Sequence, residues 1–202
     1  MQAEIIAGYY ELENEAAQAV IRRAELRIQA REPDAALEIM VGLEDGIQSG
    51  SMEEALLLHA RGTARRLQEQ YSLAVELLEK AVRLAEKNHD LIAASGSLYQ
   101  LASAYSLQGQ YETAAEHMRQ ALAYDRQMEN SPGIASALEA LARISLKQNR
   151  NEEATIYVQR AFAVYQEMGN SEGLQRISEL AAEQGLQLNT NLAESVWEQM
   201  IR

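Results

Sequence analysis

A spacing of 40 residues recurs along this chain of 202 residues and constrains its fold more than any other feature. Small or apolar residues keep that spacing at four positions across three successive segments. The four columns are Leu58, Leu98 and Leu138; Gly62, Ala102 and Ala142; Ala74, Ala114 and Ala154; and Ala81, Ala121 and Ala161. A period of this length indicates stacked supersecondary units, each burying its apolar face against its neighbours.

Each period is predicted to contain two helices. Apolar residues lie at helical spacing over two stretches, and Gly109 between them can adopt the left-handed conformation that ends a helix. A second break falls at residues 130–133, where Ser131 is predicted to cap a helix that Pro132 opens. The hydrophobic fraction of 47% consists mostly of Ala and Leu, both strong helix formers, so the sequence predicts an all-α protein.

The pattern of large, small and aromatic residues resembles the tetratricopeptide repeat. The resemblance implies a right-handed superhelical solenoid of antiparallel helix pairs, with about four units plus capping helices. The long period is similar to that of kinesin light chains and of modules in bacterial transcriptional regulators. The second unit departs from the family pattern at Arg61 and Arg65, where Leu and Tyr are expected. The segment that matches best carries Leu98, Leu101, Ala102, Tyr105, Gly109, Tyr111, Ala114, Met118 and Ala121.

All of residues 1–202 are predicted to form one solenoid domain, because each repeat needs its neighbours. A degenerate first unit covers about residues 11–50, with one helix within 11–30 and another near 33–40. The regular units cover about residues 52–90, 91–130 and 131–170. Capping helices are predicted within about 171–202, where Leu192, Val196, Trp197 and Met200 form an amphipathic stripe.

The net charge of −12 and the pI near 4.8 disfavour binding to nucleic acids or to anionic membranes by bulk electrostatics. The acidity most simply provides solubility, with a basic partner as the alternative. Cysteine is absent, so disulfides and zinc–thiolate sites are excluded. No secretory pattern is found at the first residues and no apolar run approaches membrane-spanning length, so a cytoplasmic protein is expected.

Enzymatic activity is not predicted. The three histidines, His59, His89 and His117, do not pair at the i, i+4 spacing of a helical metal site. No glycine-rich phosphate loop occurs, and paired glutamates such as Glu152 and Glu153 are most simply a solvated face. No metal and no cofactor is therefore expected.

In the tetratricopeptide family the first helices of successive units line a concave groove that receives a peptide or protein segment. The resemblance transfers this role to side chains that carry three bases and one acid. A mildly basic groove favours an acidic segment or a chain-terminal carboxylate; the alternative is that the three bases are unrelated surface charges. The predicted groove residues are His59, Thr63, Arg66, Tyr99, Gln100, Ser103, Glu139, Arg143 and Lys147.

Two devices of the family are missing at these positions. The Lys and Asn that clamp a terminal carboxylate in chaperone-binding members are replaced by His59 and Thr63, and the Asn ladder of extended-peptide binders is replaced by Gln100 and Ala140. The first hypothesis is accordingly a protein–protein interaction scaffold of unspecified partner. The alternatives are a regulatory or sensor domain of a larger signalling or transcriptional regulator, and a structural protein that self-associates, for example as a homodimer, through its end helices.

Overall fold

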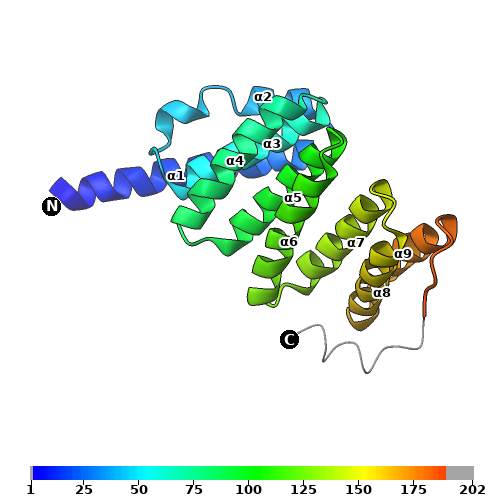
Figure 1. The fold of residues 1–202 in the computed structure, drawn as a ribbon. Coiled ribbons are helices and arrows are strands. Elements are labelled where there is room, and N and C mark those ends of the chain that lie inside the picture. Colours follow the sequence, from blue (N-terminus) through cyan, green and yellow to red (C-terminus); the bar gives the residue numbers. More distant parts are fainter. Residues whose placement is uncertain (1, 190–202) are drawn as a thin grey trace. The chain divides into compact units, whose positions relative to one another are not determined.

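The computed structural model describes residues 2–189, and all regular structure in that part of the chain is helical (Figure 1). This confirms the all-α prediction of successive antiparallel helix pairs. In chain order the elements are α1 (Gln2–Gln29), α2 (Pro33–Ile39), the 3-10 helix η1 (Leu43–Gly46), α3 (Met52–Leu67), α4 (Tyr71–Lys87), α5 (Leu91–Leu107), α6 (Tyr111–Gln127), α7 (Ser131–Lys147), α8 (Asn151–Glu167) and α9 (Ser171–Glu183).

The helices form two compact units, which we call the N-terminal unit (Met1–Gln108) and the C-terminal unit (Gly109–Arg202). In the N-terminal unit α3 packs on α4, α4 packs on α5, and α1 contacts both α2 and α3. In the C-terminal unit α6 packs on α7, α7 on α8 and α8 on α9. The division falls between the two helices of the predicted unit 91–130, and the assignment of residues 1–202 to one domain stays a prediction.

A turn of fixed geometry explains why the period is 40 residues. Helices α4 to α8 each contain 17 residues, and a three-residue turn follows each of them, so one helix and its turn repeat every 20 residues. The middle turn residue has a positive φ angle, as predicted for Gly109, whose φ is +79°. The equivalent residues are Glu69, His89, Glu129, Asn149 and Gly169.

Polar side chains satisfy the first backbone N–H groups of several helices. Ser51, Asp90 and Asn170 accept hydrogen bonds from the N–H groups at the starts of α3, α5 and α9. The prediction that Ser131 is a helix cap is wrong by one residue. Helix α7 begins at Ser131, and Asn130 is its cap residue. Asn130 instead donates to Asp125 Oδ1 at 2.8 Å, which anchors the end of α6 to the start of α7.

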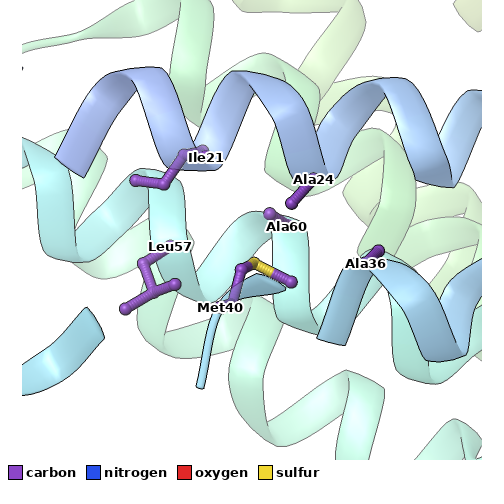
Figure 2. Close-up of a cluster of buried hydrophobic side chains, with 6 residues drawn as sticks. All are labelled: Ile21, Ala24, Ala36, Met40, Leu57 and Ala60. Atoms are coloured by element: carbon purple, nitrogen blue, oxygen red, sulfur yellow. The ribbon is translucent and has the colours of Figure 1, made fainter. Parts of the chain in front are cut away.

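The first repeat is less regular than the others. Helix α1 starts well before the predicted range 11–30, whereas α2 has only seven residues and is followed by the 3-10 helix η1. A small core nevertheless joins these elements to α3 (Figure 2). Ile21 and Met40 are at most 2% exposed, and Arg61 donates to the Met40 carbonyl oxygen at 2.6 Å. The cluster consists of Ile21, Ala24, Ala36, Met40, Leu57 and Ala60.

The described residues do not cover every part of the chain for which a prediction was made. The amphipathic stripe from Leu192 to Met200 lies outside them. Among the helices within them, none combines the length and the apolar character needed to cross a membrane.

Candidate partner-binding surface

The nine predicted site residues lie on three helices. His59, Thr63 and Arg66 are on α3 and Tyr99, Gln100 and Ser103 are on α5, so these six belong to the N-terminal unit. Glu139, Arg143 and Lys147 are on α7 in the C-terminal unit. We describe the two groups separately.

Short polar side chains on α3 and α5 make hydrogen bonds within their own unit. His59 Nδ1 lies 3.0 Å from the Ser97 hydroxyl, which links α3 to α5. The Thr63 hydroxyl is buried and donates to the His59 carbonyl oxygen at 2.9 Å, and the Ser103 hydroxyl donates to the Tyr99 carbonyl oxygen at 2.9 Å. The His59–Ser97 contact joins the two helices, whereas the Thr63 and Ser103 hydroxyls bond within their own helices, so all three groups have less capacity to bond a ligand.

Arg66 stands out because its guanidinium lies among residues of three elements. Its Nε donates to Gln100 Oε1 at 3.1 Å, which ties α3 to α5. Burial lowers the pKa of Arg66, the phenol of Tyr99 raises it, and the positive charge of Arg31 just beyond α1 lowers it again. The charges of Arg31 and Arg66 therefore interact, and neither guanidinium forms an ion pair within the described part of the chain.

The residues on α7 are arranged differently, around one carboxylate. Glu139 accepts hydrogen bonds from Arg143 Nη2 at 3.0 Å, from the Tyr165 hydroxyl at 2.8 Å and from Arg176 Nη2 at 3.3 Å. Burial alone would raise the pKa of Glu139, but these three donors together lower it. Arg143 is thus already paired, whereas Lys147 is exposed in the last turn of α7 and has no partner among the described residues.

Tyr165 is the centre of that network. Its side chain is 2% exposed, and Arg176 from α9 lies 5.7 Å from the centre of its ring, a distance suited to a cation–π contact. Burial, followed by the hydrogen bond to Glu139, raises the pKa of Tyr165 to about 12. The network fixes α7, α8 and α9 to one another.

Sequence reasoning missed Tyr165, Arg176 and Arg31. Arg176 could have been found by continuing the row of first helices onto α9. Arg31 was missed because it does not lie on a first helix but in the turn between α1 and α2, where it is the middle residue with a φ of +59°.

The His59 side chain gives a testable dependence of stability on pH. The His59 side chain is partly buried, and this burial lowers its pKa to about 4, against about 6.5 in an unfolded chain. Between these values the unfolded chain binds the extra proton, so the contribution of His59 is complete above pH 6.5 and is lost as the pH falls towards 4. The loss should amount to at most about 3 kcal/mol in the free energy of unfolding.

Urea unfolding at several pH values tests this, with His59→Gln as the control. Protonated carboxylates affect both proteins, so the difference between their pH profiles isolates the histidine. We expect the parent to lose more stability than the variant between pH 6.5 and 4. Parallel profiles would show that the ring is not held neutral.

No arrangement suited to a metal ion is found in the described residues, in the sense that no three His, Asp or Glu side chains gather there. Around Arg66 the polar groups are guanidinium, phenol and amide groups. Their chemistry suits recognition of an anion by hydrogen bonding rather than metal ligation.

Comparison with known proteins agrees with this architecture. The tetratricopeptide repeat family matches residues 53–127 and 93–167, which together span more than half of the chain. No curated protein sequence matches it.

Two solved structures share the fold. One contains the nearly identical TPR-like repeats of a Podosopora anserina protein described as a kinesin light chain. It superposes with a TM-score of 0.67 at 20% identity, and the match covers 93% of this chain and 94% of that one. Aspartyl phosphate phosphatase F from Bacillus subtilis superposes with a TM-score of 0.77 at 18% identity. This chain is covered over 94% of its length but spans only 48% of the phosphatase. At such identities the likeness concerns the fold alone.

The family match, the recurring helix pairs and the burial of the small residues in the repeat columns point to the same conclusion. The matched family is one of repeat domains, which are typically non-catalytic and are generally protein–protein interaction modules. The chain belongs to the tetratricopeptide repeat family.

Proposed function

We propose that the chain is a cytoplasmic scaffold or adaptor that binds an acidic segment of a partner protein, and that the binding surface of the N-terminal unit centres on Arg66. We call the group formed by Arg31, Arg66, Tyr99 and Gln100 the Arg66 cluster. Of the nine predicted site residues, Arg66, Tyr99 and Gln100 are the three in this cluster, which Arg31 completes.

The observation that carries the proposal is the lack of a carboxylate partner for two neighbouring arginines. The protein has 30 acidic and 18 basic residues, so acids are plentiful. Six other arginines in the described part of the chain do form ion pairs: Arg27, Arg83, Arg119, Arg143, Arg150 and Arg176. Arg31 and Arg66 instead repel each other, and a carboxylate between them would relieve that repulsion.

The geometry also favours a partner segment over a free ion. Gln100 already fixes the Arg66 side chain by bonding Nε, which leaves the two Nη groups to form a bidentate pair with a carboxylate. Tyr99 adds an amphipathic surface of the kind that contributes most at protein interfaces. A segment with one acidic side chain beside an apolar one would use both.

A peptide array tests the proposal. Peptides of equal length carrying acidic, neutral or basic side chains are probed with the parent protein, with Arg66→Glu and with Arg83→Glu. We expect the parent to retain acidic peptides, and Arg66→Glu to weaken that binding about tenfold or more. Added salt should weaken it as well.

Arg83→Glu is the matched control, because it makes the same charge change at an exposed residue of α4 in the same unit. All proteins must first show equal helicity by circular dichroism and equal melting. Equal binding of acidic peptides by the parent and Arg66→Glu would reject the Arg66 cluster as the site. Preferential binding of neutral or basic peptides would reject the proposed chemistry.

A further inference from the structure

A second pair of neighbouring arginines lies in the C-terminal unit, on α6 and α8. The two helices run parallel, because each is antiparallel to α7. Arg119 of α6 and Glu153 of α8 approach to 3.7 Å, which fixes the register between the helices. About two turns further along each helix, the same register places Arg126 near Arg160, and the charges of these two residues interact. An attractive pair is therefore followed along the helices by a repulsive one.

The chain supplies no acid to this second pair. Neither Arg126 nor Arg160 forms an ion pair within residues 2–189. Arg160 Nε is shielded from solvent and has no hydrogen-bond partner in that part of the chain. Burial, followed by the positive charge of Arg126, lowers the pKa of Arg160, so the surroundings disfavour its charged form. An external carboxylate would relieve the repulsion and offer the Nε–H an acceptor once the flexible side chain turns towards it.

The repeat itself does not require two bases at these positions. One period earlier, the residues in the columns of Arg126 and Arg160 are Glu86 and Gln120, an acid and an amide. An acid in place of either arginine would restore an attractive pair like that of the neighbouring turns. The two arginines thus destabilise the unit that contains them, and such a cost is typical of residues that bind a ligand.

Apolar and aromatic side chains lie beside the buried arginine. Ile156 precedes Arg160 by four positions on α8, which places both on one side of the helix, and Ile156 is 58% exposed. Tyr157 lies three positions before Arg160, and its phenol interacts electrostatically with the guanidinium. We call the group formed by Arg126, Ile156, Tyr157 and Arg160 the Arg160 surface.

We propose that the Arg160 surface is a second binding site for an acidic segment of a partner protein, with a carboxylate bound by Arg126 and Arg160 and an apolar side chain against Ile156. A free ion would bond the arginines but would leave Ile156 exposed. A second copy of this chain carries the same net charge of −12, so two copies repel each other. A nucleic acid is repelled for the same reason, whereas a short segment brings only a few negative charges.

A titration of the full chain followed by nuclear magnetic resonance tests the proposal, because even weak binding is then located residue by residue. The probe is a capped tripeptide of two glutamates and a leucine, and its counterpart has glutamines in place of the glutamates. We expect the glutamate peptide to shift the Nε–H signal of Arg160 and the amide signals of Ile156 and Tyr157. The glutamine peptide, and acetate at the same concentration, should shift them several-fold less.

Arg126→Glu should weaken binding at the Arg160 surface about tenfold or more, because the new acid would pair with Arg160 as Glu153 pairs with Arg119. The variant should stay folded, since Arg126 is exposed. Lys80→Glu is the matched control. It makes the same charge change at an exposed residue of the repeat column to which Arg160 belongs, but on α4 in the other unit.

Equal binding by the parent and by Arg126→Glu would overturn the proposal. Shifts confined to the signals around Arg66 would reject the second site and leave the Arg66 cluster intact, since the two sites lie in different units. Equal shifts with acetate would contradict the assignment to a protein segment. Signals of α8 that change when the protein alone is diluted would overturn it too, because the occupant would then be a second copy.

Discussion

Replacing Gly173 with alanine should destabilise the C-terminal unit by about 1–3 kcal/mol. Gly173 lies in α9 directly above the Tyr165 ring, and a Cβ atom there would meet the ring carbons at 2.3 to 2.7 Å. The ring cannot move aside easily, because it is 2% exposed and its hydroxyl is bound to Glu139. Alanine is the better helix former by nearly 1 kcal/mol, and we expect the clash to outweigh this gain.

Urea unfolding monitored by circular dichroism measures the effect, with Gly96→Ala as the control. Gly96 is also a helical glycine, but a Cβ there would meet only His59 Cε1, at an ordinary 3.7 Å. We therefore expect Gly96→Ala to be neutral or stabilising. If Gly173→Ala were equally tolerated, the close packing of α9 on Tyr165 would be wrong.

Replacing Leu138 with alanine should cost about 2–5 kcal/mol, the largest effect that we predict for a single substitution. Leu138 lies in α7 with 0% exposure, and α7 packs on both α6 and α8. Removal of three carbon atoms would leave a cavity that these helices cannot close independently, since each contact is shared with a neighbour.

The matched variants are Leu138→Met, which conserves volume and should cost less than about 1.5 kcal/mol, and Leu58→Ala. Leu58 occupies the same column of the repeat but is only partly buried, in the irregular N-terminal part of the fold. We expect its replacement to cost clearly less than that of Leu138. Thermal or urea unfolding of each variant gives the comparison, and equal losses at both leucines would show that column position, not burial, sets the cost.

The charges of the predicted groove show where sequence reasoning reaches its limit. The sequence counts three bases against one acid on the first helices, but the structure pairs Arg143 with that acid and adds Arg176 from α9 to the same carboxylate. Arg143 is therefore occupied, and the uncompensated positive charge lies instead at Arg66 with Arg31 and at Arg160 with Arg126. A count of charges along one row of helices does not reveal these partners.

Local chemistry determined the helices, and the sequence therefore predicted them. Helix propensity, apolar residues at helical spacing and a turn every 20 residues act over a few neighbouring positions, so the ends of α3 to α8 can be inferred from the chain itself. The first unit was predicted less well, because α2 has only seven residues and is followed by the 3-10 helix η1, so the regular length of helix and turn is not kept there.

Only the tertiary structure decided which side chains meet. Arg176 reaches Glu139 across 37 positions of sequence, and Arg66 reaches Gln100 across 34. Such contacts depend on the register between packed helices and on the reach of long side chains, and a shift of one helical position would exchange an attractive pair for a repulsive one. The 40-residue repeat determined the helices and their order, while the packing of those helices determined which charges are neutralised and which are left to bind.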